Sequence, residues 1–358
     1  MNRPERAAAR PESTPAHLCT VERMSCPACG AAGVVLHPDL QDRLFGVAGR
    51  WRMRRCEIAR CGTAWLDPAP HPDDLWKAYQ AYYTHEDDGA PPRVPGSRGQ
   101  QAWAAWKLGY PMPGGLVARL AGATMLLQPR RRERALSTRL QLPFVRGGRF
   151  LDVGCGSGRQ LRAMHALGWQ VLGLEPDAMA VERARQDGHE VRQGDLLSAR
   201  FEADSFDAVS MLHVIEHLVE PARQLQECRR ILRPGGRLVL VTPNVDALGH
   251  RWFGPDWRGI EAPRHLQLYS LASLQHVVHA AGLAVEHAAT RSAGAARMLR
   301  ISASLARARR RGEARASGRG SRLGDLRWRL LGSAERALVA AGLPLGEELV
   351  VVARRHGG

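Results

Sequence analysis

A glycine-rich turn and two acidic residues have the spacing that a nucleoside-binding site requires. The turn, Gly154–Gly158, follows the apolar run Phe150–Val153 and precedes a segment with helical spacing of apolar residues. Glycines let the backbone turn sharply and let a ligand approach it closely. Asp152 lies just before the turn, and Glu175 ends a second apolar run 17 positions after Gly158. Because an acid at that place can accept hydrogen bonds from both hydroxyls of a ribose, we expect a nucleoside-containing ligand here.

The elements around this turn alternate strictly between strand and helix. Helices are expected over Arg159–Gly168, Asp177–Gln186 and Glu220–Leu232. Five strands are expected, over the ranges Phe150–Val153, Gln170–Glu175, Glu190–Asp195, Phe206–Val214 and Gly236–Thr242. Such alternation predicts an α/β fold with a Rossmann-like, doubly wound parallel sheet.

The ordered series of motifs from Gly148 to Asn244 resembles the class I S-adenosylmethionine-dependent methyltransferases. The motifs are LDVGCGSG, LEPD, GDLL, FDAVSMLHVIEHL and LRPGGRLVLVTPN. The resemblance implies S-adenosylmethionine as cofactor and a seven-stranded sheet whose last strand is inserted antiparallel. The segment Phe253–Ser270 (FGPDWRGIEAPRHLQLYS) resembles a bacterial subgroup, many of whose members are associated with methylation of sugars, glycans or quinone-type metabolites.

The resemblance also implies which residues bind the cofactor. They follow the first four strands and are Asp152, Gly154, Cys155, Gly156, Gly158, Glu175, Asp195, Leu196 and His213. Asp152 and the turn would line the methionine and ribose portion, and Glu175 would bind the ribose hydroxyls. Asp195 and Leu196 would meet the adenine, and His213 would flank the sulfonium. An alternative for Asp195 is the N-cap of a following turn.

Methyl transfer is an in-line displacement, so much of the catalysis is positional, but a proton must also leave the acceptor. Histidine suits this step because its pKa lies near cellular pH. We predict His265 first and His217 second as catalytic residues, with His213 and Glu216 as further candidates. The alternative for His265 is a hydrogen bond that holds its own turn.

The sequence contains seven cysteines, and this odd number argues against a disulfide framework. The spacing of four of them indicates a metal site instead. Two pairs, each followed by glycine, resemble the knuckles of a zinc ribbon: Cys26 with Cys29, and Cys56 with Cys61. Four thiolates on two turns can close a tetrahedral zinc site. The second pair is two residues longer than the usual C-x-x-C, so Cys19 or His37 stays open as a replacement ligand, as do four reduced thiols without metal.

Composition shifts divide the chain into four parts. Residues 1–20 are expected to form a disordered tail, 21–88 a zinc-ribbon-like segment with a linking helix, and 89–147 a linker with cap helices. Residues 148–358 are expected to form the methyltransferase domain implied by the resemblance, with an Arg-rich helical insertion at about 297–341 and a closing strand at Glu348–Arg354. By the subgroup resemblance, Tyr79, Tyr82 or Tyr83 could close over the cofactor.

The formal net charge of +16 is concentrated in two regions, Gln128–Arg149 and Arg297–Leu330. The sequence contains no uninterrupted apolar run long enough to span a membrane and no apolar secretory start, so we expect a cytoplasmic protein. The two basic regions are compatible with peripheral contact with the anionic inner membrane surface.

The expected acceptor is a small molecule, a sugar or glycan, or a lipid-linked compound. RNA is a less favoured acceptor, because base methylases usually carry an Asn/Asp-Pro-Pro-aromatic tetrapeptide where this chain has MLHVIEHL. A non-catalytic protein that binds S-adenosylmethionine is a further alternative.

Overall fold

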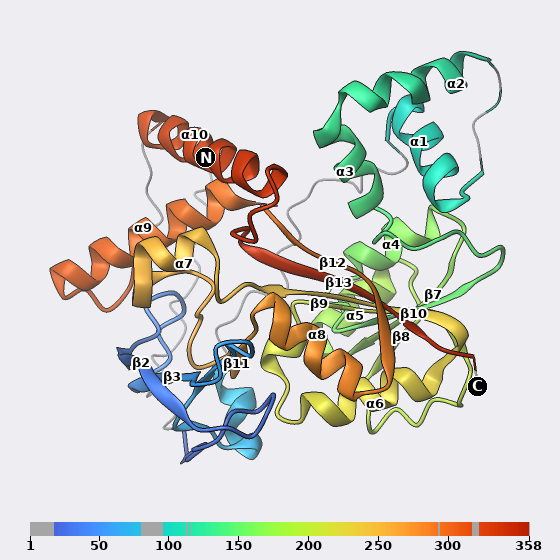
Figure 1. The fold of residues 1–358 in the computed structure, drawn as a ribbon. Coiled ribbons are helices and arrows are strands. Elements are labelled where there is room, and N and C mark those ends of the chain that lie inside the picture. Colours follow the sequence, from blue (N-terminus) through green and yellow to red (C-terminus); the bar gives the residue numbers. More distant parts are fainter. Residues whose placement is uncertain are drawn as a thin grey trace, which may run out of the picture.

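A seven-stranded sheet forms the centre of the molecule (Figure 1). The computed structural model describes residues 18–79, 96–111, 114, 116–292, 294–316 and 322–357. The predicted tail up to residue 17, Tyr82 and Tyr83 lie outside the described residues. In spatial order the strands are β12 (Leu283–Arg291), β13 (Glu348–Arg355), β10 (Leu232–Pro243), β9 (Phe206–Leu212), β6 (Arg149–Val153), β7 (Gln170–Glu175) and β8 (Val191–Gln193).

The strand directions confirm the expected topology. Strands β6 to β10 are mutually parallel, and β13 is inserted antiparallel between β10 and β12. In this register Glu348, the first residue of β13, lies opposite Pro243 at the end of β10 and opposite Arg291 at the end of β12. The reversed strand thus delivers a glutamate to the edge where the parallel strands end.

Both faces of the sheet are buried, as expected for a parallel sheet with helices on each side. Leu151 and Val209 belong to the core on one face, whereas their neighbours Phe150 and Ala208 belong to the core on the other. In Figure 1, α4 lies above the sheet, and α6 and α8 lie below it. The covering helices are α4 (Arg159–His165), α5 (Ala178–Gln186), α6 (Pro221–Ile231) and α8 (Leu271–Ala280).

Residues 18–79, which we call the N-terminal module, pack against the region after the fifth parallel strand. A four-stranded antiparallel sheet joins β2 (Gly33–Leu40), β3 (Trp51–Cys56) and β4 (Ala64–Leu66) to β11 (Gln267–Leu268). The apolar core of the module is also shared between the two regions, since Leu40, Met53 and Leu66 cluster with Trp257 and Leu268. The segment Phe253–Ser270 is therefore held by residues from the start of the chain.

Two helical groups complete the described fold (Figure 1). The cap helices are α1 (Arg98–Leu108), α2 (Leu116–Ala123) and α3 (Pro129–Ser137), and α1 begins with a capping box between Ser97 and Gln100. The second group is α7 (Leu248–Phe253), α9 (Ala295–Arg311) and α10 (Arg322–Ala340). No helix among the described residues is long and apolar enough to cross a bilayer.

One buried arginine connects the module to the segment that precedes β11. The Arg264 side chain is completely buried, and its Nη1 donates to Asp42 Oδ2 at 2.8 Å and to the Ala78 carbonyl at 3.1 Å. Its Nε donates to Glu261 Oε1 at 3.0 Å. Both carboxylates are at most 2% exposed. Glu261 also pairs with Arg258, whereas Arg264 is the ion-pair partner of Asp42 among the described residues. Removal of Arg264 would therefore leave Asp42 as a buried carboxylate without a counter-charge.

Replacing the buried arginine tests this dependence. We expect Arg264→Ala to lower the free energy of unfolding by ~3–5 kcal/mol, because it leaves the buried carboxylate of Asp42 without a counter-charge. Arg50→Ala is the matched control, since Arg50 pairs with Asp39 on the surface; we expect it to cost less than ~1 kcal/mol. Urea unfolding measures both, and equal losses in the two variants would contradict the account.

Candidate active site and metal centre

Two buried acids lie where neighbouring parallel strands end. Asp152 is near the end of β6, and Glu175 is the last residue of β7. Ser210, on β9, donates its hydroxyl to Asp152 Oδ1 at 2.5 Å. Burial, opposed by the Ser210 hydrogen bond and assisted by the nearby charge of Glu175, raises the pKa of Asp152 to about 7. Part of the Asp152 population therefore holds a proton at neutral pH.

The glycine turn is shaped by contacts that a side chain would break. Gly154 has φ +70°, and a Cβ there would lie 2.6 Å from a methyl carbon of Val214. Gly156 has φ +52°, and the space where its Cβ would point is open for 4 Å. A ligand can therefore reach the backbone at Gly156. Gly158, at φ +85°, leads into α4.

The carboxylate of Glu175 is fixed against this turn. It accepts from the Gly156 amide at 2.9 Å and from the Asp177 amide at 3.0 Å. Cys155, between the glycines, is buried, and burial raises the pKa of its thiol. A Cβ on Gly173 of the next strand would lie 2.6 Å from the Cys155 sulfur. Cys155 thus fills a small space between two strands as an inert thiol.

Asp195 caps the turn that follows β8. Its Oδ1 accepts from the amides of Leu197 at 2.9 Å and Ser198 at 3.0 Å. Leu196, beside it, is buried. This capping role is the alternative to adenine binding that we considered for Asp195 from the sequence. Because β8 pairs with β7, the carboxylate of Asp195 lies at the same edge of the sheet as Glu175.

His213 lies between two glutamates just after β9, with φ +57°. Its Nδ1 is 3.4 Å from Glu216 Oε1, and its Nε2 is 3.2 Å from Glu348 Oε1. Burial alone would lower the pKa of His213, but the two carboxylates outweigh burial and raise the pKa to about 10. At neutral pH His213 is therefore a cation. Glu348 was not among the predicted site residues. The signal that could have identified it is its place as the first residue of an apolar strand that the resemblance implies is inserted antiparallel.

His217, four residues after His213, lies against His265. Their rings are 4.6 Å apart, and Nδ1 of His265 lies 2.7 Å from the carbonyl of Gly259. Nδ1 of His217 lies 2.9 Å from the Tyr79 hydroxyl and 3.0 Å from a backbone carbonyl at residue 264. Burial is the main cause that lowers the pKa of both histidines. Together with Glu216 they form a buried polar cluster.

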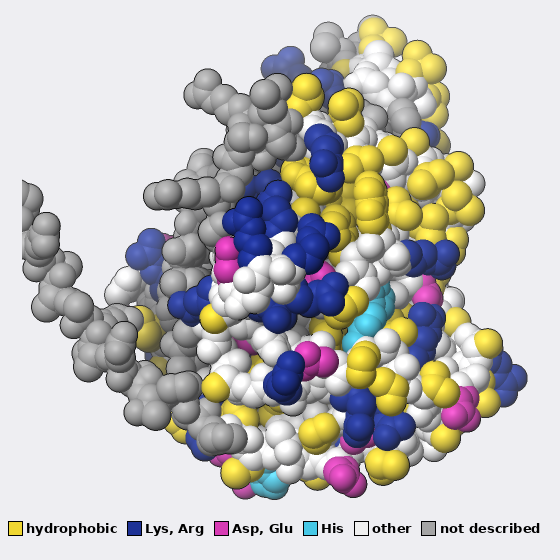
Figure 2. Space-filling view, turned by 90° about the vertical axis from the view of Figure 1, so that its left-hand side faces the viewer, with side chains coloured by type: hydrophobic (Ala, Val, Ile, Leu, Met, Phe, Trp, Pro, Cys, Tyr) yellow, Lys and Arg dark blue, Asp and Glu magenta, His cyan; other side chains and the backbone are white. Residues whose placement is uncertain are grey.

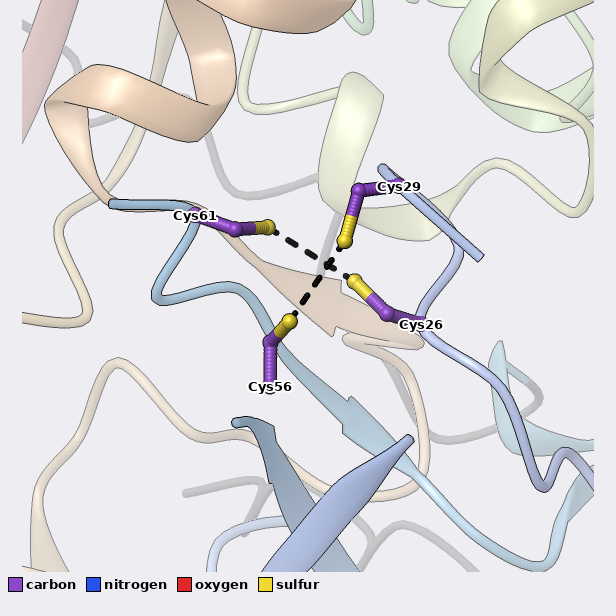
Figure 3. Close-up of side chains that lie close together, drawn as sticks. All are labelled: Cys26, Cys29, Cys56 and Cys61. Atoms are coloured by element: carbon purple, nitrogen blue, oxygen red, sulfur yellow. Dashed lines mark hydrogen bonds between the residues drawn. The ribbon is translucent and has the colours of Figure 1, made fainter. Parts of the chain in front are cut away.

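The four predicted zinc ligands converge in the N-terminal module (Figure 3). The sulfur of Cys26 is 3.7 Å from that of Cys61, and the sulfur of Cys29 is 3.5 Å from that of Cys56. A tetrahedral site with zinc–sulfur bonds of about 2.3 Å separates its sulfurs by about 3.8 Å, so the cluster fits zinc. His37, an alternative ligand, contacts His250 at 2.9 Å instead, and Cys19 is exposed.

Zinc would hold the module together, because its ligands join the start of the chain to both ends of the β3–β4 turn. We expect one zinc per chain in protein that has not met a chelator, and we expect Cys56→Ser to lose the metal and melt at a lower temperature. Cys19→Ser, a surface cysteine, should change neither. Metal analysis below a tenth of an equivalent in the unaltered protein would overturn this assignment.

The raised pKa of Asp152 predicts a pH effect on stability. The folded pKa of about 7 exceeds the value of about 3.9 in an unfolded chain, so the folded state holds the proton more tightly. The resulting stabilisation is present below pH ~4 and is lost as the pH rises to ~7. Asp152→Asn should therefore lose less stability than the unaltered protein between pH 5 and pH 8. Urea unfolding at both pH values measures this, with the exposed Asp73→Asn as the control; parallel losses would refute it.

Comparisons with known proteins agree with this architecture. Residues 127–288 match the family described as a methyltransferase domain. The chain is 38% identical over 117 residues to the ubiquinone biosynthesis O-methyltransferase of Xanthomonas oryzae, a match that covers 30% of this chain and 47% of the relative. It is 33% identical over 138 residues to a probable S-adenosylmethionine-dependent methyltransferase of Mycolicibacterium smegmatis, covering 38% of this chain and 52% of the relative. The matches thus span about half of each relative.

Among solved structures, a methyltransferase from Mesorhizobium loti is similar, with a TM-score of 0.43 and 21% identity over 62% of this chain and 97% of that one. The matched family region contains the glycine turn and all five parallel strands. Residues 127–288, which carry the glycine turn and the parallel strands, are thus similar to a methyltransferase domain.

Proposed function

We propose that this protein transfers the methyl group of S-adenosylmethionine to a small-molecule, sugar or glycan, or lipid-linked acceptor. The observation that carries the proposal is the pairing of an open glycine turn with Asp152 and Glu175 at one sheet edge. Amides, carboxylates and close backbone access are what an adenosyl group with a ribose diol requires. The relatives named as methyltransferases support the same chemistry, because the family match, over residues 127–288, contains the glycine turn and both acids.

The residues present fit the cofactor. S-adenosylmethionine carries a sulfonium and an ammonium cation, and the acids at this edge offset both charges. The carboxylate of Glu175, which now accepts from the Gly156 amide, would rotate toward the ribose hydroxyls. Gly156 leaves room for the ligand beside the backbone. Asp152 and the turn would hold the amino-acid portion, and Asp195 with Leu196 would border the adenine.

When bound, S-adenosylmethionine supplies a methyl group attached to a positively charged sulfur. The task of the protein is to hold an acceptor in line with that bond and to exclude competing geometries. His213 lies at the end of β9, next to the site, and its two glutamate contacts fix its orientation. As a cation held between two carboxylates, His213 would not act as a base.

For His265 and His217 we propose a positioning role in the acceptor side of the site. His265 is 5% exposed and contacts Gly259 within its own turn, which is the turn-holding alternative considered from the sequence. His217 connects this turn to Tyr79. The pair thus ties the loop after β9 to the segment Phe253–Ser270 and to the N-terminal module.

The central test is cofactor binding. We expect Glu175→Gln to weaken binding of S-adenosylhomocysteine at least about tenfold, because a neutral amide accepts fewer hydrogen bonds from a diol. Glu182→Gln, an exposed Glu-to-Gln change on α5, should bind normally. Isothermal titration calorimetry measures both variants.

A second measurement asks for turnover. The protein is incubated with methyl-labelled S-adenosylmethionine and a fractionated bacterial extract, and label is followed in lipid, polysaccharide, RNA and small-metabolite fractions. Label in one non-nucleic fraction that disappears with Glu175→Gln supports the proposal. Label in RNA would favour the nucleic-acid alternative, and cofactor binding without label in any fraction would favour a non-catalytic binder.

A further inference from the structure

A cavity of about 550 Å³ lies on one face of the sheet, between α3, α10 and the strand pair β12–β13. Its volume is within the range of small-molecule sites. Apolar side chains make up much of the wall: Trp103, Leu136, Ala289, Ala337, Ala340 and Val350. In Figure 2, hydrophobic side chains gather at the height of α3 and α10, beside a group of Lys and Arg.

The charged part of the wall is cationic in excess. Arg132, Arg291 and Arg336 line the cavity, whereas Glu133 is the one acid among the described lining residues. Arg291 is paired with Glu348 at 2.6 Å, and the Arg132 guanidinium lies over the Trp103 ring at 5.3 Å. An occupant that is apolar and also bears an anionic group would satisfy both properties of this wall.

One ion pair links the wall of the cavity to the methyl-transfer edge. Arg291 bonds Glu348 Oε2, and the other oxygen of Glu348 is 3.2 Å from His213 Nε2. The register of the sheet places Arg291 opposite Glu348 at the edge where the parallel strands end. Arg291, in the wall of the cavity, and His213, which is expected beside the sulfonium, therefore contact the same carboxylate.

We propose that this cavity binds the methyl acceptor, and that the acceptor is an apolar molecule with one anionic group, a carboxylate or a phosphate. This inference rests on the proposed function and narrows its acceptor class. The apolar portion would lie between α3 and α10, its anionic group would face Arg132 and Arg336, and the atom to be methylated would point along Arg291 toward His213.

Two dyes test whether the cavity prefers apolar anions. Anilinonaphthalene sulfonate is apolar and anionic, and N-phenyl-naphthylamine has the same rings without the charge. We expect one saturable site for the anionic dye, with affinity reduced at least about tenfold by Ala337→Trp, which fills the cavity from α10. Arg336→Gln should weaken the anionic dye and leave the neutral dye unchanged.

Leu338→Trp is the matched control, because Leu338 is the next residue of α10, is exposed and lies outside the cavity wall. It should bind both dyes as the unaltered protein does. Equal effects of Ala337→Trp and Leu338→Trp, or dye binding without saturation, would overturn the site. Equal loss of both dyes in Arg336→Gln would overturn the anionic preference.

Methyl transfer then connects the cavity to the reaction. Ala337→Trp should keep its affinity for S-adenosylhomocysteine but incorporate at least about tenfold less label from the extract, whereas Leu338→Trp keeps both. Normal labelling by Ala337→Trp would refute the acceptor site and leave the proposed function standing. If the unaltered protein binds no S-adenosylhomocysteine, the proposed function itself fails, and the dye result stands on its own.

Discussion

The fold of the acceptor side depends on one buried cation, Arg264, and on the short strand pairing beside it. Its contacts with Asp42 and with the Ala78 carbonyl hold the segment after the fifth parallel strand against the N-terminal module. The pairing of β11 with β4 extends the sheet of the module by one strand. A buried ion array tolerates few geometries, because each lost partner leaves a charge without compensation. The module therefore positions the segment on which His265 lies.

The segment that carries Cys56 and Cys61 also contacts the region after the fifth parallel strand. Ser270, the N-cap residue of α8, donates its hydroxyl to the carbonyl of Cys61 at 2.6 Å. Arg55 pairs with Asp246 at 2.5 Å, next to the end of β10. A metal that orders the cysteine turns would therefore also order the region beyond the strand ends, so metal loss is expected to affect the acceptor side before the cofactor side.

The parallel sheet was predictable from sequence because four of its five strands are followed by a helix. The expected strict alternation is wrong at one place, since the described chain passes from β8 to β9 without a helix. The antiparallel insertion of β13 came from the resemblance alone, and the structure confirms it. The pairing of β11 with β4 could not be predicted, because a two-residue strand has no periodicity and its partner is far away in the sequence. For the same reason the contacts of Arg264 and of Glu348 were hidden: both depend on residues that only the folded chain brings together. The fifth strand, expected to begin at Gly236, begins at Leu232 in the structure, and its pairing with β9 shifts register between Leu232 and Arg237.

The central claim is that the edge formed by the glycine turn, Asp152 and Glu175 binds an adenosyl cofactor. The most direct measurement is a crystal structure of the protein grown with saturating S-adenosylhomocysteine. The account predicts the ribose hydroxyls within hydrogen-bond distance of Glu175 and the backbone of Gly156 against the ligand. Ligand density elsewhere on the protein, or an empty edge at saturating ligand, would contradict it.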